Sequence, residues 1–184
     1  MRITGGILGS RKLQSVDSAK LRPATDRLRE TMFNILLNMM DLEGMIGLDL
    51  YAGTGSVGFE AISRGARKVV FVEADRKIAD VLRRNAAALG IEGQCDIRTV
   101  RVEKFLKVNK EKFDIVFVDP PYALNSTTHG IIDELLSSEA VRKTGIICVE
   151  HSRYYTPPPS LLIRQKAFGS TLLSFLNPET KCQN

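Results

Sequence analysis

A regular alternation of strand-like and helix-like segments is the feature that most constrains this fold. Seven short runs rich in β-branched and aromatic residues predict strands at 46–51, 69–75, 95–102, 113–119, 145–151, 161–166 and 171–176. Segments with helical spacing of apolar residues separate several of these runs, and such repetition is typical of a parallel sheet covered on both faces. Gly169 between the last two runs indicates a hairpin and an antiparallel edge. The sequence therefore predicts an α/β, doubly wound fold with a seven-stranded, mostly parallel sheet.

The composition fits one globular domain. The chain has 184 residues, of which 43% are hydrophobic, enough for a real core. It has no apolar run of the roughly 18 residues that a membrane span needs, and MRITGGILGSRK lacks the apolar centre of a signal peptide. We therefore expect a cytoplasmic protein with no membrane partner. The three cysteines, Cys95, Cys148 and Cys182, are scattered without CxxC spacing, which predicts neither a disulfide framework nor a metal site.

The positive charge is concentrated at the start of the chain. The net charge is +5, and residues 1–30 hold seven Lys or Arg against three Asp or Glu, a net charge of +4. Short glycine-flanked runs there indicate a small β-hairpin, so we expect a basic hairpin arm over 1–22 and a main domain over 23–184. Clustered basic residues bind phosphates through counterion release, although a solvated arm would carry the same charge. The candidate RNA-binding residues are Arg2, Arg11, Lys12 and Lys20.

A helix is predicted directly after the arm. Pro23 and Thr25 are typical of a helix start, with Thr25 as the N-cap and Asp26 in the positively charged first turn. Apolar residues then follow at helical spacing: Leu28, Met32, Ile35, Leu36 and Met39. This helix should bury one face.

The first strand of the alternating region ends in a glycine-rich turn, GLDLYAGTGSVGFE. Gly53, Gly55 and Gly58 satisfy GxGxxG, a pattern that serves several ligands. NAD would place its pyrophosphate at such a turn and its ribose on an acid about 20 residues on, which Glu73 fits. Asp49, at the strand end, would repel a pyrophosphate but attract the amino and sulfonium charges of S-adenosylmethionine. The turn alone therefore leaves both cofactors open, and Asp49 favours S-adenosylmethionine.

Glu73 ends the second strand in VVFVEAD. With S-adenosylmethionine bound at the turn, its carboxylate could accept both ribose hydroxyls. In a purely structural interpretation, Asp49 caps the loop and Glu73 is a solvated strand end. Two acids at successive strand ends, with a glycine turn between them, favour the cofactor interpretation.

The fourth strand stops abruptly in VFVDPPYALN. Prolines supply no backbone N–H groups to a sheet, so the strand ends there and places Asp119 and Tyr122 at the carboxyl edge. The exocyclic amino group of a nucleobase is a poor nucleophile. Asp119 and the Pro120 carbonyl could accept hydrogen bonds from its two N–H groups, so that its lone pair faces a methyl donor. Tyr122 could stack on the base. DPPY could also be a surface turn, but its place after the fourth strand favours catalysis.

These residues resemble the bacterial small-subunit rRNA (guanine-N2)-methyltransferases, a branch of the class I S-adenosylmethionine-dependent enzymes. The matching segments are MRITGG, GSRKL, LRPATDRLRETMFNIL, LDLYAGTGSVGFEAISRGA, VVFVEAD, FDIVFVDPPY and FGSTLLSFL. DPPY is shared by amino-methyltransferases of adenine, cytosine and guanine, whereas RPATDRLRETMFN is typical of this branch. The resemblance implies a Rossmann-like class I methyltransferase fold for the main domain and guanine N2 as the target.

The resemblance also implies the site residues. Cofactor-binding residues would be Arg22, Thr25 and Arg29 near the methionine end, Asp49, Tyr51, Gly53, Thr54 and Gly55 at the amino acid portion, Glu73 and Ala74 at the ribose and adenine, and Val102 at the adenine. The catalytic motif would be Asp119, Pro120, Pro121 and Tyr122. Arg101 departs from the family pattern, because many relatives carry an acidic or small polar residue there. The hairpin arm would help to hold RNA.

Three hypotheses follow. The first is a monomeric enzyme that methylates a guanine of ribosomal RNA within an assembling small subunit. The second is a DNA adenine or cytosine amino-methyltransferase, which would share DPPY. The third is a non-catalytic RNA-binding ribosome assembly factor that kept the fold and works through its basic arm.

Overall fold

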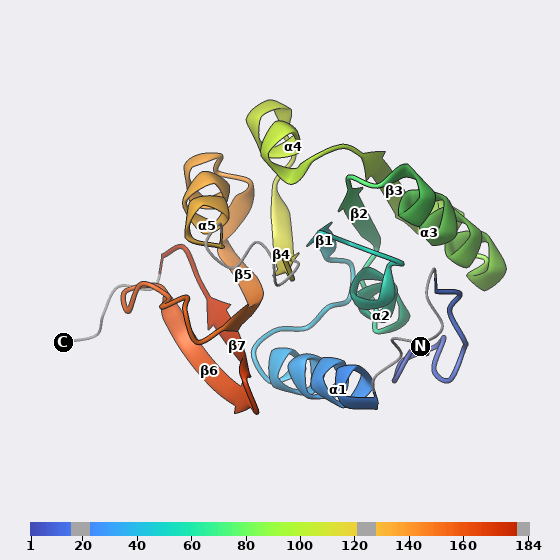
Figure 1. The fold of residues 1–184 in the computed structure, drawn as a ribbon, viewed down its shortest axis with the longest axis horizontal. Coiled ribbons are helices and arrows are strands. Elements are labelled where there is room, and N and C mark those ends of the chain that lie inside the picture. Colours follow the sequence, from blue (N-terminus) through green and yellow to red (C-terminus); the bar gives the residue numbers. More distant parts are fainter. Residues whose placement is uncertain (16–22, 121–127, 180–184) are drawn as a thin grey trace.

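Helices and strands alternate through most of the computed structural model, which describes residues 1–15, 23–120 and 128–179 (Figure 1). The helices are α1 (Pro23–Leu37), α2 (Ser56–Ser63), α3 (Arg76–Leu89), α4 (Val102–Val108) and α5 (Thr128–Ser137), with a short 3₁₀ helix at Glu92–Gln94. The strands are β1 (Ile46–Leu50), β2 (Lys68–Glu73), β3 (Cys95–Thr99), β4 (Phe113–Val118), β5 (Val141–Ser152), β6 (Leu162–Phe168) and β7 (Thr171–Leu176).

The seven strands form one sheet in the order β3-β2-β1-β4-β5-β7-β6. Strands β1 to β5 pair in parallel, whereas β7 is antiparallel to both β5 and β6. The predicted sheet and the antiparallel pairing at its edge are confirmed, with β6 as the outermost strand. The strand order reverses between β1 and β4, and ligands of such sheets bind at the carboxyl ends beside this reversal.

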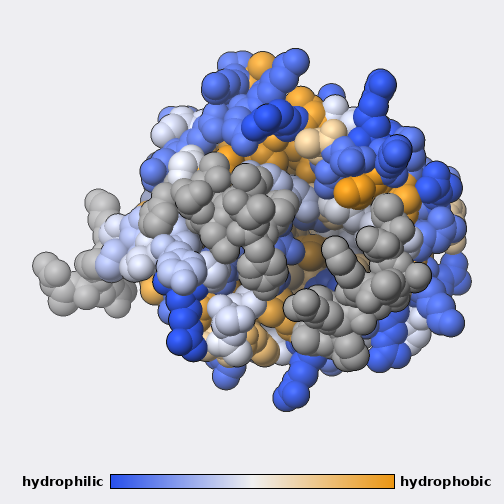
Figure 2. Space-filling model, viewed as in Figure 1, coloured by the Kyte–Doolittle hydropathy of each residue, from blue (hydrophilic) through white to orange (hydrophobic). Residues whose placement is uncertain are grey.

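Helices cover both faces of the sheet (Figure 1). Phe33 of α1 and Phe59 of α2 belong to the same core cluster as Phe117 of β4, on one face. Leu106 of α4 and Leu135 of α5 belong to a second cluster on the opposite face. Burial on both faces explains why the strands read as continuous apolar runs. On the side drawn in Figure 2, hydrophilic residues dominate the periphery, and hydrophobic residues are visible mainly farther inward.

The N-terminal segment folds as a narrow ribbon beside α2 (Figure 1). Arg2 and Lys12 form an antiparallel bridge, as the predicted hairpin requires. Ile3 and Leu13 are buried in the core cluster that includes α1 and α2. The ribbon is therefore packed into the body of the protein. The predicted division at residue 22 stays a prediction, because that residue lies outside the described ranges.

Two local predictions differ from the structure. Helix α1 begins at Pro23, so Thr25 lies inside its first turn and the prediction of Thr25 as the N-cap is wrong. Strand β3 ends at Thr99, and Val102 begins α4, a helix that was not predicted. At seven residues, α4 is too short for its apolar spacing to stand out from the neighbouring strands. No helix in the described part of the chain is long and apolar enough to cross a membrane.

Candidate active site

Three predicted acidic residues meet at the carboxyl edge of the sheet. In the strand register, Asp49 is level with Phe71 of β2 and Phe117 of β4. Glu73 and Asp119 lie two residues beyond these partners, so all three acids are placed on the same face. This face is the one that α1 and α2 cover. The sheet thus gathers negative charge beside the point where its strand order reverses.

Asp49 is almost fully buried, with 3% of its surface exposed. Its Oδ2 accepts the Gly58 N–H of α2 at 2.9 Å. Burial raises the pKa of Asp49 to about 7, the hydrogen bond from Gly58 lowers it, and the charges of Asp119 and Glu73 raise it further. Asp49 does fasten the loop, as the structural interpretation holds, but its carboxylate also lacks a cationic partner among the described residues.

Gly58 has no room for a side chain. A Cβ there would lie 2.2 Å from the Phe71 ring and 3.0 Å from Asp49 Oδ2. The third glycine of GxGxxG therefore permits the close packing of α2 against β2, which in turn brings its N–H to Asp49.

Glu73 joins two turns. Its Oε2 accepts the Gly53 N–H at 2.9 Å, and its Oε1 accepts the Asp75 N–H at 2.8 Å. Its side chain is half-buried, so the interpretation of Glu73 as a merely solvated strand end is wrong. Each carboxylate oxygen can accept a further hydrogen bond, which leaves Glu73 capable of binding a ribose.

The glycine turn has an unusual backbone. Tyr51, Gly53 and Gly55 have φ values of 61°, 56° and 89°, a region that a non-glycine residue such as Tyr51 rarely adopts. The Tyr51 hydroxyl is buried without a hydrogen-bond partner in the described chain, and its side chain packs with the cluster of α4 and α5. The Thr54 carbonyl accepts the Asn85 Nδ2 of α3 at 3.0 Å. The backbone of Tyr51 is therefore part of the turn, whereas its side chain packs against the core.

Asp119 lines a cleft of about 130 Å³ between α1 and the ends of β4 and β5. Asp119 is exposed by surface area, but protein atoms around its carboxylate displace part of the water, and this desolvation raises its pKa to about 6. Pro120 is buried, whereas Pro121 and Tyr122 lie outside the described residues. Cys148 also lines the cleft, and burial raises the pKa of its thiol so far that it stays protonated. Asp119 is thus the candidate for polar chemistry here, and Cys148 is not a nucleophile.

A fourth carboxylate, Glu150, was not among the predicted site residues. Val118 and Val149 are level in the β4–β5 register, so Asp119 and Glu150 follow as neighbours on adjacent strands. Both line the same cleft. Burial raises the pKa of Glu150 to about 8, and the charge of Asp119 contributes. GIICVEH repeats the strand-end acid of VVFVEAD, and this signal could have found it.

Arg29 lines the cleft from α1, but its guanidinium is already bound. Its Nε donates to Glu60 Oε2 at 3.4 Å and its Nη2 to Asp26 Oδ1 at 3.0 Å. It also donates to the Arg2 carbonyl. Arg29 is 3% exposed and adds no charge to the surface. Its predicted place near a cofactor therefore coexists with a clear structural role.

The other predicted cofactor residues are less central. Val102 is 4% exposed and its side chain packs in the core cluster of α4 and α5, so only its backbone remains for an adenine contact. Arg101 extends into solvent and pairs with Glu103 at 3.3 Å. Ala74 is exposed next to Glu73. Arg22 and the Thr25 side chain lie outside the described residues.

The predicted RNA-binding residues are at the surface. Arg2, Arg11 and Lys12 are exposed on the ribbon, and Lys20 lies outside the described residues. Arg11 donates to the Ala88 carbonyl at 3.4 Å, and Arg2 lies 3.9 Å from Asp26. Both remain available to a polyanion, because such exposed contacts are weak.

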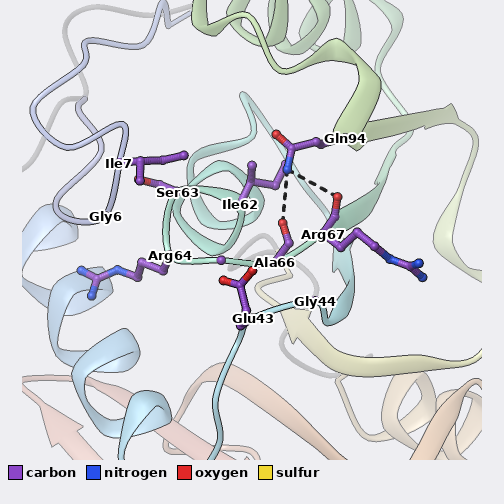
Figure 3. A pocket seen from close by; sticks show the side chains of 11 residues that line it. Gly6, Ile7, Glu43, Gly44, Ile62, Ser63, Arg64, Ala66, Arg67 and Gln94 are labelled. Carbon is purple, nitrogen blue, oxygen red and sulfur yellow. Dashed lines mark hydrogen bonds between the residues drawn. The ribbon is translucent and has the colours of Figure 1, made fainter.

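A larger cavity, of about 790 Å³, lies away from these acids (Figure 3). It includes Gly44 and Ala66, which precede β1 and β2, so it is at the opposite edge of the sheet. Gln94 Nε2 donates to the carbonyls of Ala66 and Arg67, each at 3.4 Å. In Figure 3 the guanidinium groups of Arg64 and Arg67 point away from each other. Because this cavity lies at the other edge of the sheet from the strand-end acids, we assign the chemistry to the carboxyl edge.

Comparison with known proteins gives consistent matches over the full fold. The family model described as "Conserved hypothetical protein 95" matches residues 1–177. Ribosomal RNA small subunit methyltransferase D from Haemophilus influenzae is 35% identical over 175 residues, which cover 92% of this chain and 89% of that protein. The protein of the same name from Buchnera aphidicola subsp. Acyrthosiphon pisum is 32% identical over 151 residues, 82% of this chain and 78% of that one. The solved structure of Escherichia coli yhhF has a TM-score of 0.82 at 32% identity and covers 98% of this chain and 99% of that chain.

Proposed function

Because the chain belongs to the Conserved hypothetical protein 95 family, we propose that it transfers a methyl group from S-adenosylmethionine to the exocyclic N2 of a guanine in small-subunit ribosomal RNA. The curated relatives named above are small-subunit ribosomal RNA methyltransferases, which favours RNA over DNA and catalysis over a purely structural role. We further propose that the enzyme acts as a monomer on RNA within an assembling subunit. The observation that carries the proposal is the group of acidic residues at the carboxyl edge of the sheet, together with Asp119 and Pro120 directly after β4.

The charges at this edge fit S-adenosylmethionine better than NAD. S-adenosylmethionine carries a sulfonium and an ammonium group, and either one favours an ionised carboxylate nearby. Asp49 is buried, and Glu73 and Asp119 already raise its pKa. A pyrophosphate would add negative charge at the same place. Asp49 and the glycine turn would hold the amino acid portion, and Glu73 the ribose.

The acceptor half of the reaction depends on Asp119 and Pro120. The bound cofactor supplies an electrophilic methyl group. The Asp119 carboxylate and the Pro120 carbonyl accept hydrogen bonds from the two N–H groups of the amino group. This directs the nitrogen lone pair toward the methyl group, an effect of positioning and electrostatics. The methylated nitrogen must then lose a proton. Asp119 can accept it, because its raised pKa makes it a stronger base than an ordinary aspartate.

Transfer of labelled methyl groups tests this function. Purified protein and labelled S-adenosylmethionine are incubated with small subunits that lack the modification, with naked small-subunit RNA and with duplex DNA. We expect label in RNA of the subunits and none in DNA. Label in duplex DNA alone would support the DNA enzyme, and RNA binding without any cofactor binding would support the assembly factor.

The affinity for S-adenosylmethionine should fall in acid. The pKa of Asp49 is about 7 in the free protein, and a bound cation lowers it, so binding favours the ionised form and is strongest above pH 7. Between about pH 7 and about pH 5.5 we expect a loss of roughly tenfold in affinity by calorimetry. Asp49→Asn should bind weakly at both values. A wild-type affinity that does not change over this interval would contradict the role of Asp49.

Neutralising the ribbon should weaken RNA binding without affecting the cofactor. In the double variant Arg11→Ala, Lys12→Ala, the slope of log affinity against log salt should become shallower by about 1 to 2, because each phosphate contact releases counterions. The affinity for S-adenosylmethionine should be unchanged. Lys107→Ala, Lys110→Ala removes two exposed lysines away from the ribbon and serves as the control. An equal slope in both double variants would remove the ribbon from the RNA interface.

A further inference from the structure

Glu150 lies on the acceptor side of the candidate site. Asp49 and Glu73 belong to β1 and β2, on one side of the reversal in strand order. Asp119 directly follows β4 and Glu150 belongs to β5, on the other side. Asp119 and Glu150 are next to each other across the β4–β5 pair and line one cleft. A ligand group that is bound by Asp119 would therefore lie next to Glu150.

The Glu150 carboxylate has no hydrogen-bond donor among the described residues. It is half-buried, and Asp119, the acid beside it, adds repulsion. Arg29 is the cation that lines the cleft from α1, and its guanidinium is bound by Glu60 and Asp26. The amino-terminal residue, Met1, also lines the cleft. A half-buried carboxylate without a donor is unfavourable, so a ligand that brings an N–H to Glu150 gains binding energy.

Guanine carries such a donor next to its reactive amino group. Its N1–H lies beside N2 on the same edge of the base, whereas adenine and cytosine have a ring nitrogen acceptor beside their amino groups. A carboxylate would repel the lone pair of that acceptor. We propose that Glu150 accepts the guanine N1–H while Asp119 and Pro120 hold N2, so that Glu150 selects guanine over the other amino bases. This inference rests on the proposed function and names the group that determines its base specificity.

A base analogue can test this selection separately from catalysis. 2-Aminopurine keeps the N2 amino group but has an acceptor at N1. RNA carrying either guanine or 2-aminopurine at the nucleotide that the wild-type enzyme methylates is supplied in reconstituted subunits. The value of kcat/KM is measured for each at about pH 9, where Glu150, whose pKa burial raises to about 8, is ionised and can only accept a hydrogen bond. For wild type we expect guanine to be preferred by about 100-fold, because an acceptor would face an acceptor.

Glu150→Gln should reduce this preference. The amide can donate to N1 of 2-aminopurine, so we expect the ratio of the two kcat/KM values to fall by about 10- to 100-fold, with unchanged affinity for S-adenosylmethionine. Glu150→Leu should lower transfer to guanine without improving 2-aminopurine. Glu139→Gln, an exposed glutamate, is the control and should keep the wild-type ratio. Thermal melting shows whether each variant is folded.

The outcomes are distinct. A Glu150→Gln variant that is folded and keeps the wild-type ratio would overturn the selection role, as would a wild-type ratio near one. A change in melting temperature alone, with the ratio unchanged, would show that Glu150 is a structural residue. Absence of transfer to guanine by wild type would contradict the proposed function instead.

Discussion

Asp119→Ala should lower kcat/KM for methyl transfer by roughly 100-fold or more, the effect of removing a group that stabilises a transition state. Asp119 lies exposed in the cleft and makes no hydrogen bond to the described part of the protein, so the alanine variant should fold normally. Alanine cannot accept a hydrogen bond from the amino group of the base, so the nitrogen lone pair would stay delocalised in the ring. The affinity for S-adenosylmethionine should stay within a few-fold of wild type. Single-turnover measurements with saturating cofactor separate this loss from weaker binding.

Two further variants sharpen the interpretation of Asp119. Asp119→Asn keeps one acceptor oxygen and should lie between alanine and wild type, but it cannot accept the proton that the methylated nitrogen releases. Asp133→Ala removes an exposed aspartate of α5 and should leave activity unchanged. Full activity in Asp119→Ala would exclude Asp119 from the chemistry.

Glu60→Gln should lower the free energy of unfolding by about 3 to 5 kcal/mol, because it leaves buried arginine charge without its partner. Glu60 is fully buried in α2 and lies 3.4 Å from Arg29 and 2.9 Å from Arg64. It also accepts the backbone N–H and the hydroxyl of Thr4, each at 2.7 Å. One carboxylate therefore joins α1, α2 and the N-terminal ribbon.

Urea denaturation measures this loss. Glu30→Gln, an exposed change in α1, is the control and should stay within about 0.5 kcal/mol of wild type. The weakened ribbon should also be cleaved faster by trypsin at Arg11 and Lys12. An unchanged denaturation midpoint in Glu60→Gln would show that the cluster contributes little to stability.

Much of the fold could be predicted because local pattern and tertiary burial agree. In β4, every residue except Asp114 is apolar and buried, a pattern that fits a parallel sheet covered on both faces. The start of α1 and the existence of α4 were harder to predict. Proline at 23 fits the first helical turn as well as the position before it, and α4 has only three buried apolar residues.

The acids at the strand ends were enough to predict where the site lies, but the hydrogen bonds that these acids make could not be predicted. Glu73 binds two backbone N–H groups, and Asp49 binds Gly58, because neighbouring turns bring donors that no sequence spacing reveals. Arg29 follows the family pattern, yet one of its partners is Glu60, 31 residues away in the sequence. The pattern of GIICVEH marks Glu150 as an acid near a strand end, but only the β4–β5 register shows that it lies beside Asp119. These contacts depend on which distant segments lie side by side, and the local periodicity of the sequence does not show that.

The identity of the methylated nucleoside tests the central claim most directly. Small-subunit RNA from a strain lacking the gene is compared with RNA from the complemented strain, by mass spectrometry of nucleosides and by mapping of the modified position. N2-methylguanosine at one position, absent in the deletion and restored by wild type but not by Asp119→Ala, is the predicted result. N6-methyladenosine or N4-methylcytidine in its place, or identical RNA in both strains, would contradict it.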